Sequence, residues 1–191
     1  MKNFNESLEV LKKYNKEPFH IEHGVTVGKV MKWFAKDQGL SDEEQEHWSI
    51  VGLLHDIDWE MYPDAHCIKC QELLKDEGYD EDFIYSVCAH GYKHCGSEFP
   101  PRNVMEKILY TVDELTGLIG AAKRMRPSKS TKDMDLKSLK KKFKDKSFAA
   151  GCSRDVIKDG AETIWGVELD TCLQKTLNAM QDMEDEIMAL I

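Results

Sequence analysis

The stretch SDEEQEHWSIVGLLHDID, residues 41–58, decides the fold class. Ser41, followed three residues later by Glu44, forms a capping box, a pattern that begins helices because each side chain accepts a hydrogen bond from the other residue's free backbone N–H. The predicted helix continues through apolar positions such as Trp48 and ends near His55. Similar helical spacing recurs along nearly the whole chain, and no segment alternates apolar and polar residues with a period of two. The sequence therefore predicts an all-α protein.

Apolar spacing, capping residues and glycines also predict where the other helices lie. The segment CGSEFPPRN, residues 95–103, should be a loop because it contains two prolines and a glycine. Further helices are expected at these places: one carrying His23, Val27, Val30 and Phe34 and ending near Gly39; one capped by Asp64, carrying His66 and Cys70 and closing at Gly78; one from about Asp80 to His90; one carrying Met105 to Ile119; and two more, from about Ser153 to Ile164 and from Asp170 to the C-terminus.

Length and composition are those of an ordinary globular protein. The 191 residues are 41% hydrophobic and 32% charged, which suffices for one domain with a real core and excludes wholesale disorder. No run approaches the roughly 18 consecutive apolar residues of a membrane helix, and the amphipathic start is unlike a signal peptide. We therefore expect a cytoplasmic protein that does not enter membranes. The net charge of −9 disfavours non-specific binding to nucleic acid.

The charge distribution divides the chain into two parts. Residues 121–148 contain 11 of the 26 basic residues and only three acidic ones. We expect residues 1–126 to form a helical core, with the basic segment and C-terminal helices of residues 127–191 packed on it in one compact domain. The Lys-rich residues 137–146 keep a narrow helical stripe, so they form a solvated helix face or a surface for nucleic acid or an acidic partner.

The six cysteines are expected to be free thiols, because the chain shows no secretory signal. Cys67 and Cys70 form a CxxC motif, but the sequence has no second CxxC for a four-thiolate zinc site and no preceding strand for a redox motif. The apolar spacing around Ile68 continues as a helix. We therefore predict that these two cysteines are packed core thiols.

Histidine and aspartate side chains are predicted on the inward faces of several helices. His23 shares an apolar stripe, His55 ends an apolar run, and Asp113 lies in the most apolar helix. A carboxylate there is costly unless it is paired or binds a metal, because burying an unpaired charge is strongly unfavourable. Each residue alone is explained by hydrogen bonding in the core. Together with Asp56, however, they form a set of imidazole and carboxylate ligands that suits Mn, Fe, Co, Ni or Zn.

These residues resemble the signature of the HD-domain metal-dependent phosphohydrolases. Three segments are similar to that family's H…HD…D motif in order and spacing: HGVTVGKVM with His23, GLLHDID with His55 and Asp56, and EKILYTVDELTG with Asp113. The resemblance covers about residues 20–120. It implies a bundle of α-helices, here with extra C-terminal helices, in which these four side chains bind one divalent metal ion.

Some branches of the family hold two ions, and the resemblance then implies two further histidine ligands. His66 in YPDAHCIKC and His90 in SVCAHGYKH lie at the expected places, and Asp56 would bridge the two ions. His94 and His20 are weaker candidates for ligand roles. The alternative, that His66 and His90 are surface or core histidines unrelated to a second metal, stays open.

The resemblance implies hydrolysis of a phosphate ester or anhydride in a nucleotide or another small phosphorylated molecule. A divalent ion lowers the pKa of its bound water towards about 7 and polarises a phosphoryl oxygen. Acidic side chains would orient or deprotonate that water, and the candidates are Asp56, Asp58 and Glu114. Basic side chains would hold the phosphates, and the candidates are Lys123, Arg124, Arg126, Lys129 and His94.

A non-catalytic regulatory module that binds metal and nucleotide through the same residues is the alternative, and a zinc-structural domain is a third possibility. The sequence selects no substrate among mononucleotides, cyclic nucleotides, dinucleoside polyphosphates and alarmones. Because His90 is followed by Gly91, Tyr92 and Lys93 rather than by a GYP tripeptide, the cyclic-dinucleotide branch is disfavoured. The oligomeric state and the identity of the metal are left open.

Overall fold

The computed structural model describes residues 2–191 and is all-α, as the sequence predicts. Within those residues there is no β-strand, only an isolated backbone bridge between Tyr92 and Ser97. The helices are α1 (Phe4–Tyr14), α2 (Pro18–Asp37), α3 (Asp42–Leu54), α4 (Lys69–Asp76), α5 (Glu81–Cys88), α6 (Val104–Met125), α7 (Leu136–Lys144), α8 (Arg154–Asp159), α9 (Leu169–Asp182) and α10 (Glu184–Met188). Three short elements join them: the 3-10 turns η1 (Pro63–Ala65) and η2 (Ala89–Gly91), and the π-helical η3 (Gly160–Trp165).

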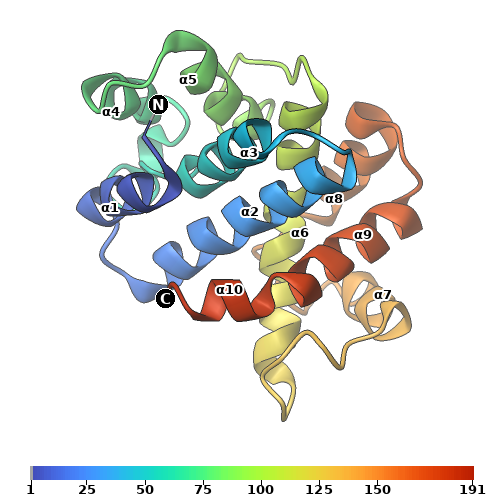
Figure 1. Ribbon diagram of the computed structural model, residues 1–191. Coiled ribbons are helices and arrows are strands. Elements are labelled where there is room, and N and C mark those ends of the chain that lie inside the picture. Colours follow the sequence, from blue (N-terminus) through green and yellow to red (C-terminus); the bar gives the residue numbers. More distant parts are fainter. Residues whose placement is uncertain (1) are drawn as a thin grey trace.

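The helices pack around a single hydrophobic core. In Figure 1, α2 and α3 cross the middle of the molecule and α6 runs behind them, while α4 and α5 lie at one end and α7, α9 and α10 at the other. Because α9 packs against both α2 and α6, residues 127–191 share the core of the preceding residues. None of the helices within residues 2–191 is both long enough and apolar enough to cross a lipid bilayer.

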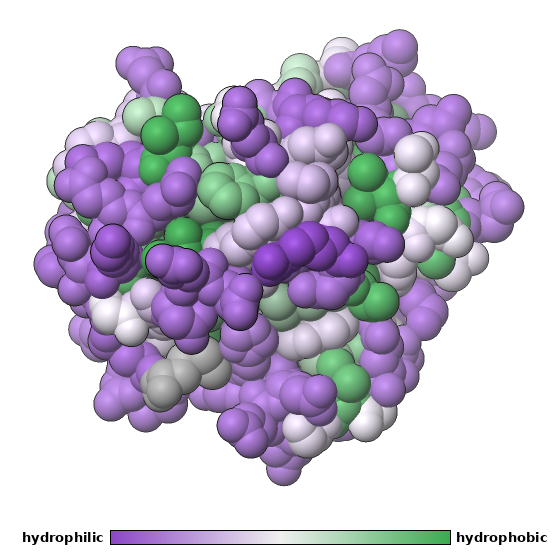
Figure 2. Space-filling model, turned by 90° about the horizontal axis from the view of Figure 1, so that it is seen from above, coloured by the Kyte–Doolittle hydropathy of each residue, from purple (hydrophilic) through white to green (hydrophobic). Residues whose placement is uncertain are grey.

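The surface is predominantly polar. Figure 2 shows one face as mostly hydrophilic, with apolar residues in separate small spots rather than in one continuous patch. In α7 the predicted apolar stripe is confirmed, because Leu139 is fully buried and Leu136 and Phe143 pack partly against the core. The lysines among residues 137–146 are exposed or half-buried, as in a solvated helix face.

Glycines let α2 and α3 pack in close contact. A Cβ atom built on Gly28 would lie 2.8 Å from the backbone oxygen of Ser49, and one built on Gly24 would approach a backbone oxygen of α3 just as closely. Real Cβ atoms do not come so near to backbone, so only glycine fits at these positions. The close contact brings the ring centroids of His23 in α2 and His55 after α3 to 5.0 Å.

The segment around His66 differs from the sequence prediction. Asp64 does not cap a helix: the chain makes the short turn η1, and α4 begins only at Lys69. Cys67 adopts a left-handed backbone conformation with a φ of 63°, which interrupts any helix at that point. Cys67 and Cys70 therefore do not share a helix, although both are buried as predicted.

The two predicted C-terminal helices also differ in detail. The first, α8, does not continue as a regular helix to Ile164 but widens at Gly160 into η3. A Cβ atom on Gly160 would lie 2.6 Å from the Thr111 hydroxyl oxygen, so this backbone packs directly on α6. The second predicted helix is interrupted at Met183, which separates α9 from α10.

Replacing Gly28 with alanine should destabilise the protein by about 1–3 kcal/mol, because the added methyl group would collide with the backbone of α3. Urea unfolding would show this change as a lower midpoint. Gly120→Ala in α6 is the matched control: its nearest neighbour is the flexible Arg124 guanidinium at 3.6 Å, so alanine should stabilise the helix by about 0.5–1 kcal/mol. Equal stability of Gly28→Ala and the natural protein would contradict the close contact.

Candidate metal centre

Four predicted ligands converge where α2, α3 and α6 meet. His23 lies in α2, Asp113 lies in α6, and His55 and Asp56 directly follow α3. Asp113 Oδ1 lies 2.9 Å from His23 Nε2 and 3.2 Å from His55 Nε2. Asp56 Oδ2 lies 3.3 Å from His55 Nε2 and 3.6 Å from His23 Nε2. These donor atoms, the first group of ligands, are close enough to share one metal ion.

The second group of ligands shares Asp56 with the first. Its other oxygen, Oδ1, lies 3.3 Å from His66 Nε2 and 3.5 Å from His90 Nε2, and these two nitrogens are 3.2 Å apart. The Asp56 carboxylate therefore faces the first group with one oxygen and the second group with the other. The structure brings together all six residues that the sequence singled out as ligands, in two groups that meet at Asp56.

Hydrogen bonds on the far side of the rings fix the orientation of three histidines. His55 and His90 each donate from Nδ1 to the carbonyl oxygen three residues earlier, at 2.7 and 2.5 Å. His66 Nδ1 lies 2.7 Å from Asp58 Oδ1. In each ring Nε2 is left to face the centre, which is the usual arrangement of histidines that bind metals.

The donor set fits a divalent transition metal. Ligands that share an ion through bonds of about 2.1 Å lie roughly 3.0–3.4 Å apart, and the histidine–aspartate pairs of the first group show similar separations, from 2.9 to 3.6 Å. Imidazole nitrogens and carboxylate oxygens suit Mn, Fe, Co, Ni or Zn. In both spacing and donor chemistry, the chain therefore contains histidine and aspartate groups positioned to hold a metal ion.

The pKa values show how strongly the charges of the centre interact. Burial lowers the pKa of His55, but the carboxylates of Asp56 and Asp113 outweigh burial and raise it well above its ordinary value. Burial opposes charge on Asp113 as well, yet the neighbouring imidazoles hold its pKa below the ordinary value. The pKa of His66 rises to about 10 against the effect of burial, chiefly through the hydrogen bond to Asp58. A bound cation would supply the positive charge that these carboxylates otherwise draw from protonated imidazoles.

The centre is open to solvent on one side. The side chains of His23, Asp56 and Asp113 are 18%, 22% and 20% exposed. In contrast, the His55 side chain is fully buried and that of His90 is 2% exposed. A narrow pocket of about 30 Å³ has His23 in its wall. A small molecule would therefore reach the first group of ligands before the second.

Two of the predicted phosphate-binding residues line this pocket. Lys123 and Arg124, near the end of α6, form part of the same wall as His23. Arg124 also pairs with Glu22 at 3.2 Å, so its charge is partly compensated. The pocket wall thus contains two cations and two carboxylates, Glu22 and Glu184, beside one side of the candidate metal centre.

The structure does not bring the other two basic candidates into the pocket. Arg126 pairs with Asp133 at 2.7 Å, and the Lys129 ammonium group donates a hydrogen bond to the backbone carbonyl of Arg124. Both side chains are therefore engaged in holding the turn after α6. Their proximity in sequence to Arg124 did not translate into proximity to the metal centre.

The two weaker histidine candidates lie outside both groups of ligands. His94 is exposed and shares a hydrogen bond with the Tyr110 hydroxyl group. His20 pairs with Glu60 at 2.9 Å, one helical turn before His23. Neither imidazole is directed at the centre.

Asp58 is placed differently from the sequence expectation. It is fully buried, and its two oxygens accept hydrogen bonds from His66 Nδ1 and from the Cys70 backbone N–H, each at 2.7 Å. Asp58 therefore orients a ligand and holds the start of α4, and it does not face water. This corrects the expectation that it orients or deprotonates the attacking water.

Glu114 links α6 to the C-terminal part of the chain. Its carboxylate accepts a hydrogen bond from the Ser153 backbone N–H at 3.0 Å, at the start of α8. Burial and the neighbouring charge of Asp113 raise the pKa of Glu114 to about 7. The Glu114 carboxyl group is half-buried and directly follows the ligand Asp113 in sequence. It is engaged by the backbone of Ser153 rather than by the centre.

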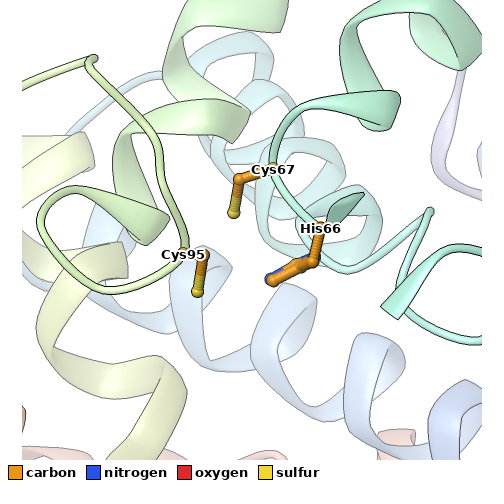
Figure 3. A group of neighbouring side chains, drawn as sticks. All are labelled: His66, Cys67 and Cys95. Atoms are coloured by element: carbon orange, nitrogen blue, oxygen red, sulfur yellow. The ribbon is translucent and has the colours of Figure 1, made fainter. Parts of the chain in front are cut away.

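Sequence analysis missed two cysteines beside the centre. The Sγ atoms of Cys67 and Cys95 form a group with His66 in which all donor atoms lie within 4.8 Å of one another (Figure 3). A hydrogen bond shared by the two thiols lowers the pKa of Cys95 to about 4 and raises that of Cys67. A signal was present, because each cysteine directly follows a histidine, His66 or His94. The helix expected from Asp64 to Gly78 placed Cys67 in the core, and Cys95 was expected in the loop of residues 95–103, so nothing linked the two.

Searches with the whole chain found no matching protein-family model, no significantly similar curated protein and no significantly similar solved structure. No relative therefore supplies a function, a metal or a substrate for this chain. The resemblance to HD-domain hydrolases depends on the motif residues themselves.

Asp58→Asn should weaken the binding of an ion by His66 about 10- to 100-fold, because the lost carboxylate no longer fixes the ring or raises its basicity. Calorimetric titration with Mn²⁺ should show one binding event that weakens and one that does not change. Asp64→Asn, which removes an exposed carboxylate from the same segment, is the control and should bind like the natural protein. If Asp58→Asn binds both Mn²⁺ ions with unchanged affinity, Asp58 does not orient His66 for metal binding.

Proposed function

We propose that this protein is a metal-dependent phosphohydrolase of the HD-domain superfamily. The observation that carries the proposal is that the six predicted ligands form two groups that share Asp56, whose two oxygens face the two groups. These ligands come from distant parts of the chain, and His23 and Asp113, 90 positions apart, are in direct contact. Four imidazoles and two carboxylates are the residue types that the H…HD…D pattern, extended to two ions, requires.

The ions would supply the reactive chemistry, because a divalent cation lowers the pKa of bound water and polarises a phosphoryl oxygen. The residues of the chain hold and orient the reacting groups. One ion would be held by His23, His55, Asp56 and Asp113, and a second by Asp56, His66 and His90. Since only the first group is appreciably exposed, the phosphate of a substrate would approach from the side of His23.

Lys123 and Arg124 favour a phosphorylated substrate. Both are cations in the wall of the pocket at His23, and a guanidinium group can bind phosphate through two parallel hydrogen bonds. The pocket has a volume of only about 30 Å³, so the side chains that line it, Arg124 and Glu22 among them, would have to move before a nucleotide could enter. A nucleotide or another small phosphorylated molecule is therefore the proposed substrate class.

A non-catalytic module that binds metal and nucleotide is the second candidate function. The pairing of Arg124 with Glu22 at 3.2 Å favours it, because a compensated guanidinium is less able to stabilise the charge that develops on a phosphoryl group during hydrolysis. The two functions differ in turnover. An enzyme releases a product, whereas a module binds the nucleotide and leaves it intact.

Protein purified without chelator or nickel resin should contain about two divalent ions per chain by mass spectrometry, one for each group of ligands. The His66→Ala/His90→Ala double variant should contain about one, because it keeps only the first group intact. An equal content of about one ion in both proteins would restrict the site to the first group. No ion, even after Mn²⁺ or Fe²⁺ is supplied, would contradict a metallohydrolase.

A panel of mononucleotides, cyclic nucleotides and dinucleoside polyphosphates, assayed with Mn²⁺, should include a substrate that the natural protein hydrolyses. Asp56→Ala should reduce product release to background, because both groups lose their shared ligand. Asp64→Asn should retain activity, and circular dichroism checks that each variant is folded. Binding of a nucleotide by the natural protein without any release of product would support the module instead.

A further inference from the structure

A third group of donor atoms borders the proposed two-ion centre. Cys67 is fully buried after η1, Cys95 is half-buried in the loop after η2, and the His66 ring points into the space between them (Figure 3). The three donor atoms lie within 4.8 Å of one another. Among residues 2–191 no other group of potential metal ligands contains sulfur. Its donor chemistry therefore differs from that of the two groups that share Asp56.

The backbone is shaped to bring the two thiols together. Cys67 holds a left-handed conformation, with a φ of 63°, which is costly for a residue other than glycine. Gly91 leaves the space that the thiols occupy, because a Cβ atom there would lie 2.2 Å from Cys67 Sγ and 3.2 Å from Cys95 Cβ. Any side chain at this position would displace one of the cysteines. Two separate backbone features thus permit the same approach of the sulfur atoms.

His66 belongs to two groups of donors at once. Its Nε2 atom lies 3.3 Å from Asp56 Oδ1 and 3.2 Å from His90 Nε2. Because Nδ1 is held by Asp58, Nε2 is also the ring atom that remains to bind an ion together with the thiols. An imidazole nitrogen has one lone pair and binds one ion at a time. An ion held with the thiols therefore excludes His66 from an ion shared by Asp56 and His90.

We propose that His66, Cys67 and Cys95 form a binding site for a thiophilic ion such as Zn²⁺. Thiolate sulfur is a soft donor that selects zinc and similar ions, and two sulfurs with one imidazole leave one tetrahedral position open. The groups around Asp56 offer only nitrogen and oxygen, which also suit Mn and Fe. Zinc at the thiolate site withdraws His66 from the second ion position, a consequence that rests on the proposed two-ion centre. Excess zinc then converts a two-ion centre into a one-ion centre.

Co²⁺ tests the thiolate site directly, because cobalt bound to thiolate absorbs strongly in the near ultraviolet and cobalt bound only to nitrogen and oxygen does not. The reduced natural protein should develop this absorption on titration with Co²⁺, and Zn²⁺ should remove it. Cys67→Ser and Cys95→Ser should each weaken this cobalt binding by at least roughly 10- to 100-fold. Loss of a hydrogen-bond partner of a ligand already costs that much, and these variants lose a ligand itself. Cys152→Ser, at a half-buried cysteine outside the group, is the matched control and should keep the full absorption.

Absence of the thiolate absorption in the natural protein would overturn the proposal, and so would its persistence in both Cys67→Ser and Cys95→Ser. Circular dichroism of each variant distinguishes a lost ligand from a lost fold. Cys95 is only half-buried, so serine is tolerated there better than at the fully buried Cys67. If Cys67→Ser does not fold, Cys95→Ser decides the question.

Displacement of Mn²⁺ distinguishes this proposal from the proposed function. Adding Zn²⁺ to Mn²⁺-loaded protein should release about one Mn²⁺ per chain, seen as the paramagnetic resonance of the free ion, and Cys95→Ser should need at least about tenfold more Zn²⁺. If both proteins release Mn²⁺ at the same Zn²⁺ concentration, zinc merely replaces manganese at Asp56. That result would overturn the proposed competition between the two sites for His66. Failure to find any substrate would count against the phosphohydrolase while the cobalt absorption still supported the thiolate site.

Discussion

The carboxylate of Asp56, which is only 22% exposed, is the constraint on which the rest of the structure depends. An unpaired charge in the interior is strongly unfavourable, so the fold has to surround this group with imidazoles or cations. Four histidines do so, and two of them, His23 and His55, also compensate Asp113. Consequently α2, α3, α6 and the segment from η1 to η2 must converge on one point. The close packing of α2 on α3 at Gly28 makes that convergence sterically feasible.

The centre that results is asymmetric in exposure and in donor chemistry. On the open side, His23 stands in the wall of a pocket with two basic residues of α6. On the closed side, His66 and His90 are buried, and the thiols of Cys67 and Cys95 lie beside them. In the proposed hydrolase, nitrogen and oxygen donors therefore face the open side, and sulfur donors lie behind them. The proposed competition for His66 would make the ion content, and with it the proposed activity, depend on the supply of metals.

The long helix α6 connects the centre to the C-terminal part of the chain. It carries Asp113, the two basic residues of the pocket, and Glu114, which accepts a hydrogen bond from the backbone of Ser153. The next residue, Arg154, donates hydrogen bonds to several backbone carbonyls of the segment 142–152 and so holds that loop together. A shift of α6 would therefore move a ligand, the two basic residues of the pocket and the C-terminal helices together.

The sequence by itself determined the helical class and many helix boundaries, because caps such as Ser41 and Asp80 and the spacing of apolar residues are local signals. Apolar helix faces also singled out His23, His55, Asp56 and Asp113, since imidazoles and carboxylates there require partners. The resemblance to the HD-domain pattern added His66 and His90. Only the tertiary structure decided that Asp58 orients a ligand and that Cys67 meets Cys95. Those contacts form between loops, where a left-handed residue and hydrogen bonds between separate segments set the side-chain directions, and no repeating pattern in the sequence encodes them.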